Sequence, residues 1–165
     1  MDTKVQKAIN DQIKYELESG YLYLAMSAHF EAANLPGFAR WMRLQAREEL
    51  GHAMRLYNYV LDRGGRIELQ AIAKPPADFG TPLSIFEAAL AHEKQVTDLI
   101  RRLYETAITQ KDHATQVYLQ WFITEQVEEE KNAGTAVEQL RMAGDAAAAL
   151  LMLDGRFGAR SEDGD

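Results

Sequence analysis

Turn-forming residues gather at a few points of this chain and divide it into four long segments with helical periodicity. We expect helices at residues 4–33, 38–63, 82–111 and 113–143. Thr81 and Pro82 are suited to the N-cap and first turn of the third helix. Gly144 follows the fourth helix, and a short fifth helix is expected at residues 146–153, before Asp154 and Gly155. The pattern predicts an all-α protein.

The connections between these helices predict how they are arranged. Two of them are short turns, so helices one and two, and helices three and four, should form antiparallel pairs. The remaining connection, residues 65–81, has 17 residues and can reach about 55–60 Å. The second helix is only about 40 Å long, so this connection can run the full length of the molecule. We therefore predict a four-helix bundle with one long crossover between the second and third helices.

Glutamates interrupt the apolar stripe of every long helix near its middle. They are Glu16, Glu49, Glu93 and Glu129, and no lysine or arginine shares these stripes. A buried carboxylate without a partner costs several kcal/mol, and several together repel one another. Two divalent cations would neutralise four carboxylates, and His52, three residues after Glu49, adds a nitrogen ligand on the same helix face. The chain has no cysteine, so oxygen and histidine must supply the ligands.

Several polar residues lie beside this predicted metal centre. Glu48, Glu125 and Glu128 are each one residue from a stripe position, and with Glu129 they form either a further cation site or a solvated acidic edge. Tyr23 is seven residues after Glu16 on the same stripe. It is either a core tyrosine with a bonded hydroxyl or a functional group that bonds a metal ligand or supplies an electron.

Composition restricts the partners of the chain. Its net charge of −7 argues against nucleic acid and is compatible with attracting cations. We find no apolar run long enough to span a bilayer and no apolar signal segment near Met1, so a cytoplasmic location is the expectation. We expect one domain over residues 1–157, followed by a flexible acidic tail at residues 158–165.

These residues resemble the ferroxidase signature of the ferritin family, in its bacterial, haem-free form. The resemblance rests on Glu16 with Tyr23, the run 48–52 (EELGH), Glu93, and the run 125–129 (EQVEE), and it covers nearly the whole chain. It implies that Glu16, Glu49 and His52 bind one iron, and that Glu49 bridges to a second iron held with Glu93 and Glu129. Gln126 would lie beside the pair, and a third iron would bind at Glu48, Glu125, Glu128 and Glu129.

The same resemblance implies a function. Ferritins oxidise Fe²⁺ with O₂ or peroxide and deposit ferric oxyhydroxide inside a shell of twenty-four subunits. Haem is not expected, because Leu50 stands where haem-binding relatives have a methionine after the bridging glutamate.

Three alternatives stay open at this point. The first is a di-iron oxidase or peroxidase acting on an organic substrate. The second is a DNA-protecting mini-ferritin, whose metals bind between subunits and whose tail is often basic, whereas this tail is acidic. The third is a purely structural helical protein, against which the glutamates in the core stripes argue.

Overall fold

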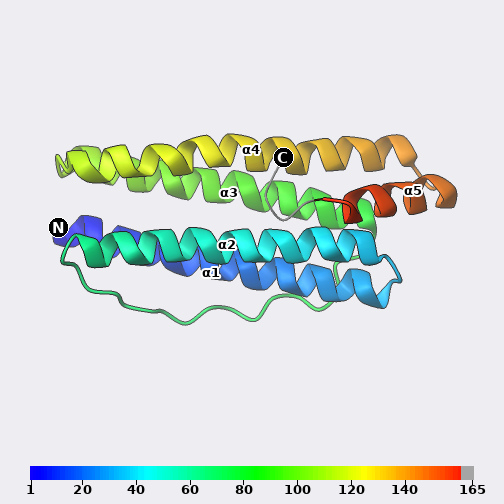
Figure 1. The fold of residues 1–165 in the computed structure, drawn as a ribbon, viewed down its shortest axis with the longest axis horizontal. Coiled ribbons are helices and arrows are strands. Elements are labelled where there is room, and N and C mark those ends of the chain that lie inside the picture. The colour runs from blue at the N-terminus through cyan, green and yellow to red at the C-terminus, as the bar shows by residue number, and fades with distance from the viewer. Residues whose placement is uncertain (161–165) are drawn as a thin grey trace.

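A computed structural model describes residues 1–160 and confirms the predicted bundle with one long crossover (Figure 1). The first four predicted helices agree with the structure to within two residues at each end. The helices are α1 (Thr3–Ala32), α2 (Pro36–Asp62), α3 (Pro82–Thr109), α4 (His113–Ala143) and α5 (Ala147–Gly158). None of the helices in residues 1–160 is both long and apolar enough to cross a membrane.

Side-chain caps explain where α1, α3 and α4 begin, and they come from Asp2, Thr81 and Asp112. Asp2 accepts a hydrogen bond from the Lys4 amide at 2.8 Å at the start of α1. Thr81 accepts one from the Ser84 amide at 3.2 Å, so the predicted cap of α3 is confirmed. These contacts satisfy amides that have no partner within the first helical turn.

The crossover between α2 and α3 runs alongside the bundle next to α1 (Figure 1). Asn10 on α1 holds its first part, because its side chain donates to the Arg66 carbonyl and accepts from the Glu68 amide, both at 3.0 Å. Further along α1, Glu18 accepts a hydrogen bond from the Ala73 amide at 3.3 Å. These bonds satisfy backbone groups in a segment without regular secondary structure.

The apolar core consists of two clusters with a polar layer between them. One cluster contains Phe30, Phe38 and Phe86. The other contains Ile9, Leu56 and Phe122. The glutamates of the four helix stripes occupy the layer between the clusters, so packing at both ends of the bundle positions the centre.

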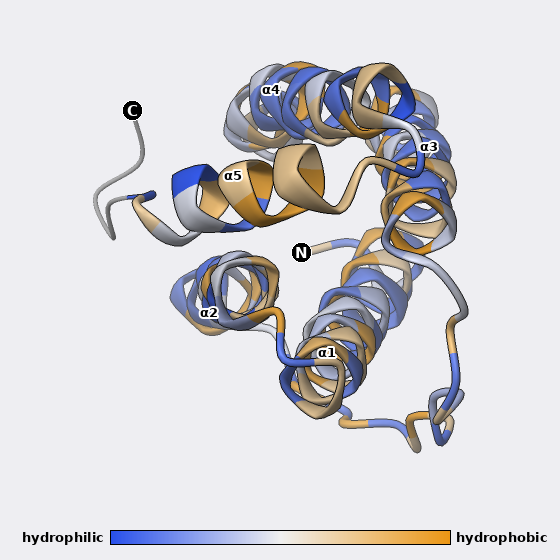
Figure 2. Ribbon diagram, turned by 90° about the vertical axis from the view of Figure 1, so that its right-hand side faces the viewer, coloured by the Kyte–Doolittle hydropathy of each residue, from blue (hydrophilic) through white to orange (hydrophobic). Residues whose placement is uncertain are grey.

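The fifth helix is longer than predicted and packs against both α2 and α4 (Figure 2). Asp154 and Gly155 were expected to end it, but both lie within it. The Asp154 side chain instead accepts a hydrogen bond from the Phe38 amide at 2.8 Å and so caps the start of α2, where Leu35 provides no side-chain cap. Phe157 in the added turn stacks edge-on against Phe38, with 5.3 Å between ring centroids.

Part of the predicted acidic tail falls outside the described residues. Gly158 is the last residue of α5, and Arg160 makes contacts with α2 that are described below. Residues 161–165 are not described, so the flexible tail stays a prediction.

Gly37 is predicted to be essential for the docking of α5. A Cβ atom at this position would lie 1.8 Å from the Asp154 carbonyl oxygen, so Gly37→Ala must push α5 away from α2. We expect destabilisation by about 1–3 kcal/mol or more, as for other overpacked sites, and faster proteolysis at α5. Thermal unfolding and limited trypsin digestion would measure both effects.

Gly51→Ala is the matched control on the same helix. An added Cβ there meets no atom within 4 Å, and alanine favours a helix over glycine by about 0.5–1 kcal/mol. If the two variants unfolded at the same temperature and were digested alike, the close approach of α5 to Gly37 would have no structural importance.

Candidate metal centre

Four glutamates, one from each long helix, lie in the polar layer of the core. Glu16, Glu49, Glu93 and Glu129 are between 0% and 4% exposed, and His52 is 5% exposed. The stripe pattern thus located correctly the charged side chains that are inside the bundle. Whether these residues bind metal must be judged from their geometry.

Three ligand atoms of the first helix pair converge on one point. The Nδ1 atom of His52 lies 3.5 Å from Glu49 Oε2 and 3.9 Å from Glu16 Oε2. Atoms that bind one ion at about 2.0–2.2 Å lie roughly 3–4 Å from each other, so this spacing fits a shared cation.

The same two oxygens have no hydrogen-bond partner. Glu16 Oε2 and Glu49 Oε2 are the only buried side-chain nitrogen or oxygen atoms in residues 1–160 that lack one. Buried polar atoms are nearly always bonded, so an orphaned pair calls for an explanation. Both oxygens face the His52 ring, and a bound cation there would satisfy them together.

Glu93 is held by hydrogen bonds from two neighbours. The Tyr23 hydroxyl donates to its Oε1 atom, and the Gln126 side-chain amide donates to its Oε2 atom at 3.2 Å. Tyr23 was expected either to bond a metal ligand or to supply an electron, if it is functional. The structure contains the first of these, a hydrogen bond from Tyr23 to Glu93, which is a proposed ligand. Glu93 belongs to neither group of three clustered ligand atoms found in residues 1–160, so its predicted role at a second ion stays a prediction.

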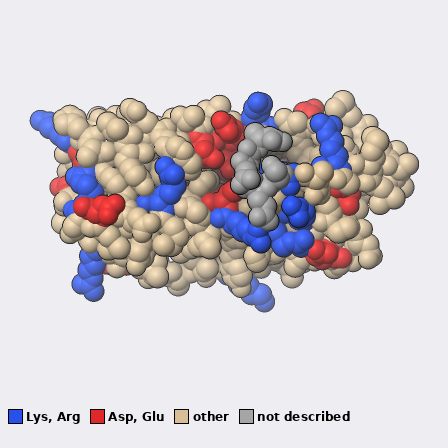
Figure 3. Space-filling model, in the orientation of Figure 1, with Lys and Arg blue, Asp and Glu red and all other residues tan. Residues whose placement is uncertain are grey.

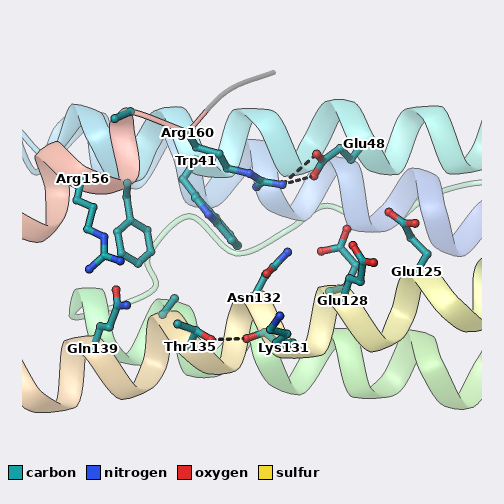
Figure 4. Close-up of a pocket in the computed structure, with 14 residues that line it drawn as sticks. Trp41, Glu48, Glu125, Glu128, Lys131, Asn132, Thr135, Gln139, Arg156 and Arg160 are labelled. Atoms are coloured by element: carbon teal, nitrogen blue, oxygen red, sulfur yellow. Dashed lines mark hydrogen bonds and ion pairs between the residues drawn. The ribbon is translucent and has the colours of Figure 1, made fainter. Parts of the chain in front are cut away.

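The predicted outer residues divide into two sets. Glu125 and Glu129 form a second group of clustered ligand atoms with His52, all within 4.8 Å of one another. Glu48 and Glu128 line a cavity of about 480 Å³ together with Glu125 and Glu129 (Figure 4). The Glu48 carboxylate, however, forms an ion pair there with Arg160, at 3.0 Å.

Sequence reasoning missed three residues that bond glutamates of the centre or of its outer edge. Gln12 donates to Glu16 Oε1 at 2.8 Å, and Gln45 donates to Glu129 Oε2 at 2.8 Å. Gln12 precedes its partner Glu16 by four residues, and this one-turn spacing could have indicated it. Gln45 precedes Glu49 by four residues but bonds Glu129 on another helix, which local spacing does not predict. Arg160 lies beyond the last helix, and no spacing rule predicts its contact with Glu48.

Burial and mutual repulsion raise the pKa of the buried acids. Burial, followed by the charge of Glu49, raises the pKa of Glu16 well above its usual range. Burial, followed by the charge of Glu93, has the same effect on the pKa of Glu49 and raises the pKa of Glu129 to about 7. A centre without cations therefore retains protons near neutral pH, and a bound cation would displace them.

A four-helix bundle with a crossover and converging buried carboxylates defines the class of ferritin-like metal-binding bundles. A family model for the ferritin-like domain matches residues 6–143. The chain belongs to the ferritin family.

Relatives of known sequence support this assignment along nearly the whole chain. The bacterial non-heme ferritin of Bacteroides fragilis is 43% identical over 157 residues, which cover 95% of this chain and 98% of that protein. The bacterial non-heme ferritin of Staphylococcus aureus is 38% identical over 157 residues and 95% of both chains.

Solved structures show the same fold. An open-pore ferritin from the hyperthermophilic archaeon Archaeoglobus fulgidus superposes with a TM-score of 0.96 at 45% identity, covering 98% of this chain and 99% of that one. A closed form engineered from the ferritin of the same organism also gives a TM-score of 0.96, at 46% identity and 98% coverage of both chains.

Glu129 is expected to make the stability of the metal-free protein depend on pH. Its pKa of about 7 lies above the ordinary value of 4.5, so the folded chain binds this proton more tightly than the unfolded chain. The resulting stability is fully present below about pH 4.5 and is lost as the pH rises through about 7. Glu129→Gln removes the titration and can still accept the hydrogen bond from Gln45.

We compare the melting temperatures of metal-free Glu129→Gln and the metal-free unmodified protein. The variant should gain on the unmodified protein as the pH rises from about 5 to about 7.5. We expect a relative gain of about 2–5 °C, measured in the presence of a chelator. The same difference at both pH values would mean that Glu129 titrates normally in the folded chain.

Proposed function

We propose that this chain is an iron-storage protein that oxidises Fe²⁺ at a paired site within its helical bundle. One observation supports the proposal above the others: two orphaned carboxylate oxygens face a histidine nitrogen inside the bundle of a ferritin. The substrate is iron, the oxidant is O₂ or peroxide, and the product is ferric oxyhydroxide.

At the paired site, Glu16, Glu49 and His52 bind the first Fe²⁺, and Glu49 bridges to a second one held with Glu93 and Glu129. Each Fe²⁺ loses one electron, so two of them reduce one O₂ to peroxide as two protons are taken up. Carboxylates stabilise Fe³⁺ more than Fe²⁺ because the attraction grows with charge. Tyr23 and Gln126 orient Glu93 through their hydrogen bonds, and Tyr23 is also a candidate electron donor.

A third iron binds at the outer acidic cluster, which we define as Glu48, Glu125, Glu128 and Glu129. These residues line the cavity beside the paired site, and Glu129 is adjacent to both (Figure 4). We infer that oxidised iron leaves the paired site by this side. The location is the cytoplasm, and haem plays no part, since Leu50 follows the bridging glutamate.

The structure bears on the alternative functions. In a mini-ferritin the metals lie between subunits, whereas here Glu16, Glu49 and His52 come together within one chain. An oxidase acting on an organic substrate needs an apolar pocket beside the metals. The cavity of about 480 Å³ beside the centre has four glutamates among its lining residues, which favours passage of a cation.

Glu49→Leu tests the paired site. The substitution removes a repelled buried charge, so the metal-free protein should keep its melting temperature or gain up to about 1–4 kcal/mol of stability. Rapid oxidation of Fe²⁺, followed by absorbance of the ferric product, should be lost. Glu105→Leu, on the exposed surface of α3, should oxidise iron at the normal rate. Normal oxidation by Glu49→Leu would remove the bridge from this proposal.

The shell of twenty-four subunits can be tested separately by mass. Leu151 and Met152 on α5 are 62% and 71% exposed, which is unfavourable for apolar side chains unless another subunit covers them. We expect a native mass of about 450 kDa, twenty-four times 18.6 kDa, by light scattering after size-exclusion chromatography. Leu151→Glu should shift the protein toward smaller species. A monomer or dimer as the only unmodified species would contradict the shell.

A further inference from the structure

Arg160 enters the cavity of the outer acidic cluster from beyond the end of α5 (Figure 4). One of its terminal nitrogens donates to both oxygens of Glu48 at 3.0 Å, and the other donates to the side-chain oxygen of Gln45. The guanidinium also lies over the Trp41 ring, 5.3 Å from its centroid. Within residues 1–160, Arg160 thus has three partners, all of them on α2.

Gln45 connects this arginine to the paired site. Its amide oxygen accepts from Arg160, while its amide nitrogen donates to Glu129 at 2.8 Å. With Arg160 in place, the two Glu48 oxygens and one Glu129 oxygen are therefore engaged by protein groups. These are oxygens that the outer cluster would offer to a cation.

The ion pair between Arg160 and Glu48 is also accessible to a cation that could replace Arg160. The side chains of Arg160 and Glu48 are 19% and 31% exposed, in contrast to the buried glutamates of the paired site. Figure 3 shows acidic side chains reaching the surface near the middle of the bundle, next to lysine and arginine. A partly exposed ion pair is weaker than a fully buried one, so a divalent cation can displace it.

We propose that Arg160 is a built-in counter-cation of the outer acidic cluster, which a metal cation must displace in order to bind there. The inference rests on the proposed outer site. Two positive charges a few ångströms apart repel, so the guanidinium and a metal ion do not occupy the cluster together. When the ion enters, Glu48 turns to it, and Gln45 loses its acceptor contact with Arg160.

The consequence is an order of filling. The paired site has orphaned oxygens and, among the described residues, no lysine or arginine bonded to them, so it fills first. The outer cluster fills later, because its ion must also break the contacts of Arg160. Asp154 and Phe157 keep α5 docked while the arginine beyond its end moves.

The test is calorimetric titration of the metal-free, full-length protein with Zn²⁺, which is redox-inert. Glu128→Gln identifies the outer event as the one that it weakens. Arg160→Gln should strengthen this event by roughly 10-fold and leave the paired-site events unchanged. Arg160→Lys keeps the charge but not the paired geometry, so its effect should be intermediate. Arg156→Gln is the matched control, since Arg156 lines the same cavity and has no ion pair within residues 1–160.

Trp41 gives a second readout that is independent of affinity. In a Trp121→Phe background it is the only tryptophan, and loss of the stacked guanidinium should change its emission as the outer event proceeds. The change should be absent in Arg160→Gln. An unchanged outer affinity in Arg160→Gln, or a silent Trp41 in the arginine-containing protein, would overturn the role of Arg160. Absence of the paired-site events themselves would instead count against the proposed function.

Discussion

The repulsion among four buried carboxylates is the constraint on which the rest of the structure depends. Each long helix brings one of them to the middle of the bundle, and the packing there is polar for that reason. Uncharged donors stabilise the carboxylates without neutralising their charge. These donors are Gln12, Gln45, Tyr23 and Gln126, and each bonds a carboxylate oxygen. Two oxygens remain unbonded, so the protein alone leaves the centre incomplete. Selection for packing alone would have replaced these acids with apolar residues.

Much of the fold followed from the sequence, because periodicity and turn residues are local signals. The crossover was predicted from chain length, and its path along α1 agrees. The buried glutamates were found because charge in an apolar stripe is conspicuous. The end of α5 was predicted wrongly: Asp154 followed by Gly155 resembles a helix stop, but the aspartate caps α2, a contact 116 residues away in sequence. The contacts of Arg160 were not predicted for the same reason, since its partners are fixed only by tertiary packing.

The fifth helix combines several tasks because of where it docks. It fills the space between α2 and α4, and Asp154 accepts a hydrogen bond from the Phe38 amide at the start of α2. The contact is close enough that Gly37 tolerates no side chain. The same docking carries the chain toward Trp41 and delivers a guanidinium to the acidic cavity. The support of α2 and the placement of Arg160 thus depend on one interface, and loosening that interface would affect both.

The division of the bundle into two antiparallel pairs has a consequence for how the chain folds. Glu16, Glu49 and His52 all belong to the α1–α2 pair, which a short turn joins, whereas Glu93, Gln126 and Glu129 belong to the α3–α4 pair. Local pairs of this kind form early, and joining them across the long connection carries the larger loop-closure entropy. An ion bound by the first pair, as proposed above, would turn the approach of Glu93 and Glu129 from repulsion into attraction. On this proposal, the metal that the mature protein stores would also favour the final docking step of its own subunit.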